Sequence, residues 1–400
     1  MKLLAISEHY FPRVGGTVNY VHETLCALSA LGVEAELLVP GPAPNGWLPN
    51  GMAEPPYTVT WIDAGYPAKG DPGREQRYSF CQQVNDLAAE RAAGPDRPDV
   101  LHVLFGLFIM EVLETEKLRQ AGLPVLASVM NVPPMECRQI SHNAPLRAQL
   151  KEALRLKLVT MKNNYRLKRH SYDRYFVISP PVGVLLAPIV GAELVEVIGL
   201  GPTSELHAQM TPPATRRPNG TVRLLTVGGY APHKRQHILP ETATRLREAG
   251  VDFVWEIAGP AGRVRSYFDN IRAEIATRGL QDRVIAQDSV PFRDLGALYD
   301  RANIYVQPSI EEGFCLTALD AAAVGLPVIG CRAGALPEIV AASGGDLVPS
   351  APEPLAEAIA GFVKSDRWQD PAAQAQHVKS LFSWTRAAAE LKSHYDRLTA

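Results

Sequence analysis

Pro-Ser-Ile-Glu-Glu-Gly-Phe-Cys-Leu-Thr-Ala-Leu-Asp-Ala-Ala-Ala-Val-Gly-Leu-Pro, residues 308–327, is the most informative stretch of this 400-residue chain. The apolar residues 304–306 before it predict a strand. Its own pattern predicts a helix that opens at about Phe314 and ends near Gly325, with Pro327 just beyond. Free backbone N–H groups at such a helix start attract a phosphate. The stretch therefore predicts a strand, a short loop and a helix that together can hold an anion.

Two carboxylates and a glycine in this stretch indicate what surrounds the phosphate. Glu312 lies at the mouth of the expected helix, and Asp320 follows eight residues later. Gly313 would let the backbone approach a phosphate closely. A carboxylate would repel the phosphate, so we expect both acids to accept hydrogen bonds from neutral hydroxyls. A ligand that has a phosphate with hydroxyls on either side of it is a nucleotide sugar, so the stretch predicts a nucleotide-sugar site. The alternative is an ordinary strand, loop and helix with surface acids.

The stretch resembles the signature of the retaining family-4 glycosyltransferases (glycosyltransferase group 1), which have the GT-B fold. That signature is Glu-Gly-Phe-Gly, a second Glu eight positions after the first, and a Gly-x-Pro-Val strand start. The resemblance implies that Glu312 holds hexose hydroxyls and Asp320 holds the ribose. It also implies that the amides of Phe314, Cys315 and Leu316 hold the distal phosphate. Two residues depart from the pattern, because Cys315 replaces a Gly and Asp320 is one methylene shorter than Glu.

A second motif supplies positive charge. The sequence Val-Gly-Gly-Tyr-Ala-Pro-His-Lys, residues 227–234, follows the first expected strand of the second half and includes Gly228. A lysine there can neutralise a diphosphate leaving group without a metal. The family pattern is Gly-Arg-x-x-x-x-Lys, so Lys234 matches its lysine whereas Gly229 replaces its arginine. His233, Arg235 and His237 are candidates to replace that charge, and a solvated lysine is the alternative interpretation of Lys234.

Glycines near the N-terminus suggest a third contribution. Gly15 and Gly16 lie between the first expected strand and helix, where they allow a tight turn and present amides. Simple turn chemistry explains them equally well. The resemblance implies that they lie beside the donor phosphates and the acceptor, with Thr17 on the acceptor side.

The resemblance implies further contacts with the acceptor and the nucleobase. Met130 stands where the family has a histidine, and the adjacent Asn131 can still hydrogen-bond a hydroxyl. Val290 falls where the family contacts the base through main chain. His102, near another strand end, is expected to be structural. The turn at 334–338 resembles the family's Gly-Gly-x-Pro-Glu. The expected catalytic pair is Glu312 and Lys234, with no metal and no cofactor.

Length and composition fit a globular enzyme. The chain is 46% hydrophobic and 20% charged, which is ordinary for a protein with a sizeable core. A formal net charge of −2 gives no reason to expect nucleic acid. The cysteines are odd in number, scattered and without metal-ligand spacing, which favours a reducing compartment. The apolar run at residues 3–6 is too short for a signal core, and the run at 182–192 is too short to span a bilayer. We therefore expect a cytoplasmic protein.

Strands alternating with helices along both halves predict α/β architecture with parallel sheets covered on both faces. The fold expected is GT-B, two doubly wound Rossmann-like domains facing a central cleft, with a C-terminal helix crossing back to the first domain. The Pro-rich segment between the halves is expected to be a linker. The boundaries are 1–198 for the acceptor-side domain, 199–220 for the linker, 221–378 for the nucleotide-sugar-binding domain and 379–400 for the terminal helix.

Residues 150–169 predict an amphipathic helix. Leu150, Leu154, Leu158, Met161 and Tyr165 form its apolar stripe, and basic residues accompany them. Such a helix can dock on anionic lipid. The favoured interpretation is a helix that packs its stripe on the first domain with a solvated basic side.

These features predict a retaining, metal-independent glycosyltransferase that moves a sugar from a nucleoside diphosphate sugar to an acceptor hydroxyl. The acceptor can be a small molecule, a glycan or a lipid-linked molecule. Three alternatives share the architecture: a glycoside phosphorylase, a nucleotide-sugar epimerase and a non-catalytic partner protein. The sugar, nucleotide, acceptor and oligomeric state are left open by the sequence.

Overall fold

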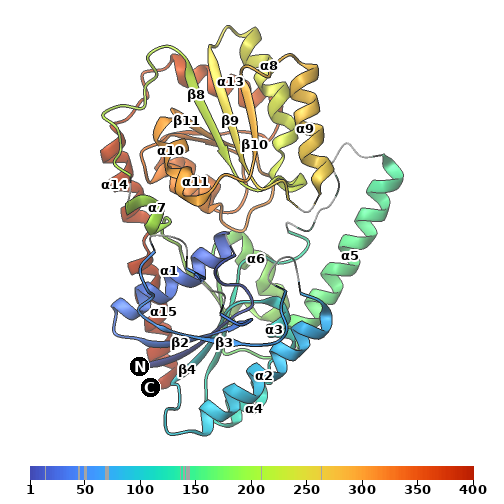
Figure 1. Cartoon of the computed structure of the whole chain (residues 1–400), viewed down its shortest axis with the longest axis vertical. Helices are drawn as coiled ribbons and strands as arrows, with labels where there is room; N and C mark the ends of the chain where they lie inside the picture. The colour runs from blue at the N-terminus through green and yellow to red at the C-terminus, as the bar shows by residue number, and fades with distance from the viewer. Residues whose placement is uncertain are drawn as a thin grey trace. The chain divides into compact units, whose positions relative to one another are not determined.

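The computed structural model describes residues 1–13, 15–43, 46–48, 52–67, 72–135, 137, 140, 145–208, 210–262 and 264–400. The chain divides into two compact units. Unit 1 comprises residues 1–132, 160–200 and 383–400, and unit 2 comprises residues 133–159 and 201–382. Each unit is built around its own parallel sheet. Figure 1 follows the chain through these elements.

Unit 1 contains a seven-stranded sheet in the order β3-β2-β1-β4-β5-β6-β7. Every neighbouring pair in it is parallel. The central strands are buried along nearly their whole length, which explains their continuous apolar runs. The strands are β1 (Lys2–Ser7), β2 (Glu34–Pro40), β3 (Thr58–Ile62), β4 (Val100–Phe105), β5 (Val125–Val129), β6 (Arg174–Val177) and β7 (Val195–Val197).

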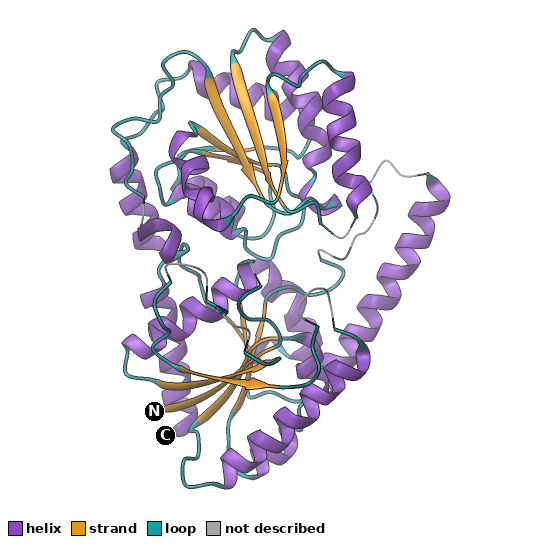
Figure 2. Ribbon diagram, in the orientation of Figure 1, coloured by secondary structure: helices purple, strands orange, loops and turns teal. Residues whose placement is uncertain are grey.

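Helices flank this sheet, as Figure 2 shows. The last helix of the chain, α15, packs on α1, with the rings of Tyr20 and Trp384 6.2 Å apart. The Ser383 hydroxyl caps α15 by accepting from the Arg386 amide. The helices are α1 (Gly16–Ala30), α2 (Arg74–Ala93), α3 (Leu107–Val112), α4 (Thr115–Gln120), α5 (Leu146–Arg169, which begins in unit 2), α6 (Pro180–Val190), the short η1 (Ala192–Leu194) and α15 (Trp384–Thr399).

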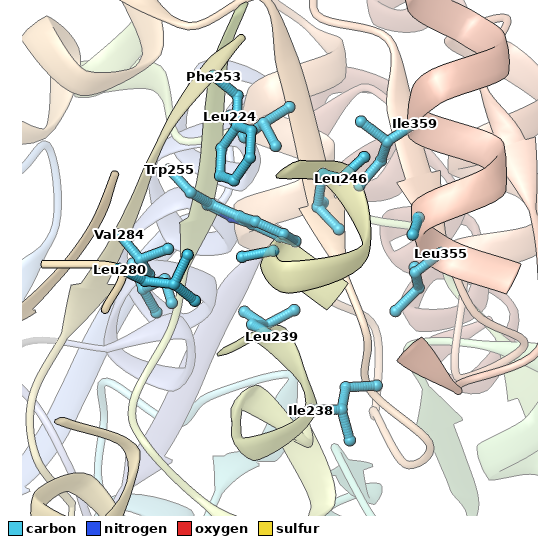
Figure 3. Packing of buried hydrophobic residues seen from close by; sticks show 14 of the residues in the cluster. Leu224, Ile238, Leu239, Leu246, Phe253, Trp255, Leu280, Val284, Leu355 and Ile359 are labelled. Atoms are coloured by element: carbon cyan, nitrogen blue, oxygen red, sulfur yellow. The ribbon is translucent and has the colours of Figure 1, made fainter. Parts of the chain in front are cut away.

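Unit 2 contains a six-stranded sheet in the order β10-β9-β8-β11-β12-β13, again entirely parallel. Its core is centred on Trp255, which is fully buried and packs among Leu224 and Phe253 (Figure 3). The indole Nε1 donates to Thr226 Oγ1 at 3.1 Å, so the one polar atom of this side chain is satisfied. The strands are β8 (Val222–Val227), β9 (Phe253–Gly259), β10 (Val284–Asp288), β11 (Ile304–Gln307), β12 (Val328–Gly330) and β13 (Asp346–Leu347).

Helices flank this second sheet as well, and α8 packs against α13. They are α7 (Ser204–Ala208), the 3₁₀ turns η2 (Pro232–Lys234) and η3 (Gln236–Ile238), α8 (Leu239–Glu248), α9 (Arg265–Thr277), α10 (Phe292–Arg301), α11 (Leu316–Ala322), α12 (Leu336–Ala342), α13 (Pro352–Lys364) and α14 (Pro371–Leu381). The strand–helix alternation and parallel sheets confirm the expected α/β class.

Both sheets have a point where the strand order reverses. In unit 1 this point lies between β1 and β4, and in unit 2 it lies between β8 and β11. Loops that leave the carboxyl ends of two such strands run in opposite directions and open a crevice, where doubly wound proteins bind ligands. Each unit therefore presents one favoured place for a site.

The helix expected from Phe314 to Gly325 is shorter in the structure, where α11 spans Leu316–Ala322. Cys315 precedes it in the left-handed region with φ 86°, which is incompatible with an α-helical turn. At the other end, the Leu326 amide donates to the Ala321 carbonyl and closes the helix. The expected helix was therefore too long at both ends.

The stretch expected as a linker, 199–220, contains α7 and an anchored arginine. Arg216 is buried, and its guanidinium donates to the carbonyls of Tyr299, Asp300, Ala302 and Val324 at 2.7–3.0 Å. Burial lowers the pKa of Arg216 to about 10, so it stays protonated at neutral pH. Residues from Gly201 to Phe382 belong to unit 2.

The apolar stripe of α5 does not pack on unit 1 as expected. Leu150, Leu154, Leu158, Met161 and Tyr165 are exposed. Amphipathic periodicity identifies the stripe, but it does not say which face turns inward. None of the helices in the described part of the chain combines the length and apolar content needed to span a bilayer.

Candidate active site

The switch point of unit 2 brings Lys234 and Glu312 together. Lys234 ends the turn η2 that follows β8, and Glu312 lies in the loop after β11. The Lys234 Nζ donates to Glu312 Oε1 at 2.8 Å and to Oε2 at 2.9 Å. The sequence predicted a role for each residue but not their direct contact.

Two neighbours besides Lys234 hold the Glu312 side chain in place, and a third lies against its backbone. Ser309 Oγ donates to Oε1 at 2.6 Å, and Gln307 Nε2 donates to the same oxygen at 3.2 Å. Gly334 supports the backbone from behind, because a Cβ there would lie 2.6 Å from the Glu312 carbonyl oxygen. Gly334 also has φ +52°, so glycine is favoured there on two counts. The turn at 334–338 is thus the support of the Glu312 loop.

The ion pair keeps Glu312 charged despite its burial. Burial by itself would raise the pKa of Glu312, whose side chain is 4% exposed. The charge and hydrogen bonds of Lys234, the Ser309 hydroxyl and the charge of His233 outweigh it and hold that pKa below its usual value. The Lys234 side chain is 21% exposed, so the cation faces solvent on one side.

The loop from Gly228 to Lys234 is fixed by the neighbouring β9 loop. The Tyr230 amide donates to the Pro260 carbonyl at 2.9 Å, and Gln236 Nε2 donates to the Gly229 carbonyl at 3.0 Å. The His233 carbonyl accepts from the Ile310 amide at 3.0 Å, which joins this loop to the Glu312 loop. The lysine is therefore held by backbone on both sides of the switch point.

Three residues were candidates to replace the family arginine at Gly229. His237 is engaged elsewhere, since its Nδ1 lies 2.9 Å from the Tyr267 hydroxyl. Arg235 acts electrostatically on Tyr267 and Cys331. The charge of His233 is among the causes that lower the pKa of Glu312.

Asp320 is not part of the Lys234–Glu312 cluster. Its carboxylate accepts from the Thr203 amide at 2.7 Å, from Thr203 Oγ1 at 3.0 Å and from His207 Nε2 at 3.3 Å. The side chain is buried. Sequence reasoning missed Thr203 and His207, because no motif links them to an acid more than a hundred positions away.

The backbone at 313–316 begins α11. Cys315 occupies the N-cap position with φ 86°, and its carbonyl accepts from the amides of Ala318 and Leu319. Burial raises the pKa of the Cys315 thiol, so the thiol stays protonated. This chain therefore holds the left-handed conformation at a residue that carries a side chain.

Val290 lies in the loop between β10 and α10, at the carboxyl edge of the sheet. The preceding Ser289 has φ 57°, and its amide donates to the Gly259 carbonyl at 3.1 Å. Asp288 accepts from the Ala261 amide at 2.9 Å and forms an ion pair with Arg265. The loops that follow β9 and β10 are thereby tied together.

The first-half candidates all lie in unit 1. Gly15 is the N-cap residue of α1, its carbonyl accepts from the Val18 amide at 3.1 Å, and Gly16 and Thr17 open the helix. Val14, between this turn and the preceding proline loop, lies outside the described residues. Met130 directly follows β5 and is buried, and Asn131 is half-buried.

Glu8 is a candidate that sequence reasoning missed. It follows β1 at the switch point of unit 1, where it is buried, and its Oε1 accepts from the Ile109 amide at 2.6 Å. A Cβ on Gly106 would lie 2.6 Å from that oxygen, so this glycine makes room for the carboxylate. Burial raises the pKa of Glu8. The sequence did carry one signal for Glu8, namely a polar residue directly after the first strand.

His102 is structural, as expected. Its Nδ1 lies 2.6 Å from the Tyr395 hydroxyl on α15, and its Nε2 lies 2.9 Å from Ser128 Oγ. Burial lowers the pKa of His102 to about 3, so the ring is neutral at physiological pH. No group of three or more histidine, cysteine or acidic side chains suited to hold a metal occurs among the residues that the structure describes.

Residues 210–379 match the protein family described as "Glycosyl transferases group 1". A curated relative, the D-inositol 3-phosphate glycosyltransferase of Corynebacterium glutamicum, is 29% identical over 216 residues, which cover 50% of this chain and 51% of the relative. The chain spans about half the length, or less, of the first curated relatives it matches.

Solved structures of other proteins resemble the whole chain, and two of them serve as examples. Sucrose-phosphate synthase from Thermosynechococcus elongatus has a TM-score of 0.75 at 23% identity, covering 99% of this chain and 98% of that one. Anabaena HepE, solved with UDP and glucose, has a TM-score of 0.68 at 16% identity, covering 99% and 100%. At these identities the likeness concerns the fold, which is GT-B.

Proposed function

Because residues 210–379 match the family of group 1 glycosyl transferases, we propose that this protein transfers a sugar from a nucleoside diphosphate sugar to an acceptor hydroxyl. We further propose that the anomeric configuration is retained and that no metal takes part. The observation that carries the proposal is the Lys234–Glu312 ion pair at the switch point of unit 2.

Lys234 is suited to bind the diphosphate. Its ammonium group ends a loop that is held on both sides by backbone hydrogen bonds, and 21% of the side chain is exposed. A phosphate that arrives there would take over the cation and gain charge-assisted hydrogen bonds. As the sugar–phosphate bond breaks, negative charge grows on the leaving oxygen, and a cation already in place stabilises it. Lys234 thereby supplies the positive charge that a metal ion supplies in other enzymes.

Glu312 is suited to orient the sugar. Once Lys234 turns to the phosphate, the carboxylate keeps its hydrogen bonds from Ser309 and Gln307 and can accept others from sugar hydroxyls. In the step proposed, the acceptor oxygen bonds to the anomeric carbon on the face that the phosphate leaves. The bond between the anomeric carbon and the phosphate oxygen breaks, and the acceptor proton passes to that leaving oxygen. No side-chain nucleophile is needed, and the configuration is retained.

The remaining donor contacts follow the resemblance. The amides of Phe314, Cys315 and Leu316 would hold the distal phosphate, the main chain at Val290 the base, and Asp320 the ribose. Asp320 already accepts three hydrogen bonds, and the longest, 3.3 Å from His207, is the one that a ribose hydroxyl would displace most readily. Gly15, Gly16, Thr17, Met130 and Asn131 remain the candidates for the acceptor side.

Calorimetric titration with UDP, GDP, ADP and dTDP tests the donor site, first without metal and then with added Mg²⁺. We expect saturable metal-free binding of one diphosphate that Lys234→Ala abolishes. Binding only with Mg²⁺ would refute the metal-free proposal, and binding of none of the four would favour a non-catalytic protein.

Turnover with the diphosphate sugar so identified tests the chemistry. The anomeric proton coupling of the product in nuclear magnetic resonance reports retention directly. Turnover that requires inorganic phosphate would indicate a phosphorylase, and an altered donor without an acceptor would indicate an epimerase. Glu312→Ala should remove transfer, whereas a scaffold role would survive that change.

A further inference from the structure

The helix α5 presents a continuous apolar stripe to solvent. Six large side chains at intervals of three or four residues lie on one face of it, and each is between 58% and 72% exposed. They are Leu146, Leu150, Leu154, Leu158, Met161 and Tyr165. Elsewhere in the described chain, exposed large apolar side chains are Val184, Leu185, Val197, Ile285 and Leu381, which form no comparable run.

The opposite face of α5 shows that this orientation is built into the helix. Glu152, Asn163 and Leu167 are the buried residues, so two of the three inward side chains are polar. Glu152 pairs with Arg155, whose NηH₂ also donates to the Cys137 carbonyl. An amphipathic helix ordinarily buries its apolar stripe. Here the inward face carries the buried Glu152 and Asn163, and the apolar stripe is exposed among the residues that the structure describes.

Charge on α5 narrows the choice of partner. The helix carries eight basic residues and a single acid, Glu152, within a chain of formal net charge −2. Arg155 is neutralised by Glu152, and Arg166 pairs with Glu111. Lys151, Lys157 and Lys162 are exposed beside the stripe. The partner must therefore offer an apolar interior and negative charge along the same line.

We propose that α5 docks this protein on an anionic lipid bilayer. The helix lies in the plane of the interface, with its leucine stripe in the acyl boundary and its lysines against headgroup phosphates. A second copy of this chain is a poorer occupant, because two strongly basic helices would repel each other along the contact. The proposal goes beyond sugar transfer and does not depend on it.

Flotation with vesicles of stated composition tests the proposal. We expect the full chain to float with phosphatidylcholine vesicles that contain about 30 mol % phosphatidylglycerol, and much less with phosphatidylcholine alone. Raising NaCl from about 0.05 M to about 0.5 M should weaken the binding, because the headgroup contribution is screened. Binding that ignores lipid charge would overturn the proposal.

Two triple variants separate the apolar and the basic contributions. Leu150→Gln, Leu154→Gln and Leu158→Gln together should reduce vesicle binding by at least tenfold, since each removes an inserted side chain. Lys151→Gln, Lys157→Gln and Lys162→Gln together should reduce it by about a hundredfold, at roughly fivefold for each lysine. Glutamine keeps high helix propensity, so circular dichroism should be unchanged in both.

Matched controls come from other exposed helical positions. Val184→Gln, Leu185→Gln and Leu381→Gln remove the same number of exposed apolar side chains, and Lys117→Gln, Lys364→Gln and Lys379→Gln remove the same charge. Both controls should bind vesicles like the parent chain. Equal losses in controls and α5 variants would refute a role for α5.

Light scattering after size-exclusion chromatography tests whether a second copy of this chain covers the stripe instead of lipid. If the parent chain is a dimer that the leucine variant converts to a monomer, while vesicle binding is absent, the stripe is a self-association surface and the proposal fails. Diphosphate binding measured in the same variants should be unchanged, so failure of docking and failure of the donor site are separate results.

Discussion

Lys234 and Glu312 are 78 positions apart, yet the Nζ of one lies 2.8 and 2.9 Å from the two carboxylate oxygens of the other. The pair joins the loops that follow the two strands at the switch point of unit 2. Backbone hydrogen bonds fix each loop, and the sheet places β8 next to β11. The two side chains are therefore brought together by the fold of unit 2.

Removing the cation should destabilise the ligand-free protein more than removing both charges. Lys234→Met leaves Glu312 buried without its ion pair, and we expect a loss of about 3 kcal/mol in the free energy of unfolding. The double variant Lys234→Met/Glu312→Gln should recover a large part of it, because the amide needs no counter-charge. Urea unfolding of the parent chain, Lys234→Met, Glu312→Gln and the double variant measures the coupling, and additive losses would contradict a direct interaction.

Acid should weaken the protein through Glu312. Its pKa is lower in the folded chain than in the unfolded chain, so its contribution to stability is full above the unfolded value, near 4.3. That contribution is lost as the pH falls through the folded pKa. Glu312→Gln should therefore flatten the fall in unfolding free energy below about pH 4.3. If the unfolding free energy of Glu312→Gln fell in acid as steeply as that of the parent chain, Lys234 would not hold the carboxylate charged.

Glu8 should affect the pH dependence of stability in the opposite direction to Glu312. Burial raises its pKa in the folded chain, so its contribution is present at pH below the unfolded value and is lost as the pH rises through the folded pKa. Glu8→Gln keeps an acceptor for the Ile109 amide and removes the titration. We expect the variant to gain stability relative to the parent at neutral pH and to lose that advantage in acid, measured by thermal unfolding across pH.

Gly334→Ala should displace the Glu312 loop. The substitution meets an unfavourable φ of +52° and places a Cβ 2.6 Å from the Glu312 carbonyl oxygen. Gly250→Ala is the matched control, since Gly250 has φ +71° with nothing within 4 Å of its Cβ. The control should lose about 1–2 kcal/mol from backbone strain alone. Gly334→Ala should lose more and also reduce donor turnover by tenfold or more, on the order expected for a displaced polar group.

Cys315 should reverse the usual ranking of alanine over glycine. At ordinary backbone angles glycine costs about 1 kcal/mol relative to alanine. At φ 86° the Cβ is strained, so Cys315→Gly should exceed Cys315→Ala in stability by about 1 kcal/mol, although both lose the buried thiol. Chemical denaturation ranks the two, and a more stable alanine variant would show that this φ is not left-handed in solution.

Periodicity and turn chemistry identified most strands and helices, because apolar runs of the parallel strands are nearly continuous. Errors arose where a local pattern does not set the outcome. The start of α11 depends on the left-handed Cys315, and the outward stripe of α5 goes with an inward face that carries the buried Glu152. Both are decided by tertiary contacts.

The site was predictable only as separate motifs. Lys234 and Glu312 each stood in a recognisable spacing, but the bonds that Ser309 and Gln307 give to Glu312 lie in residues without a distinctive pattern. Asp320 could be found by its spacing, whereas its partners Thr203 and His207 come from a segment expected to be a linker. Such pairings are set by sheet order, which short motifs do not encode.

The parallel course of every strand has a practical consequence for engineering. Lys234, Glu312 and Val290 all follow carboxyl ends of strands, while Trp255 and the core around it lie within the strands and helices. Recognition and folding are thus encoded in largely separate residues. Libraries confined to the loops after β8, β10 and β11 that keep Lys234 and Glu312 can vary the proposed donor site without changing the core around Trp255.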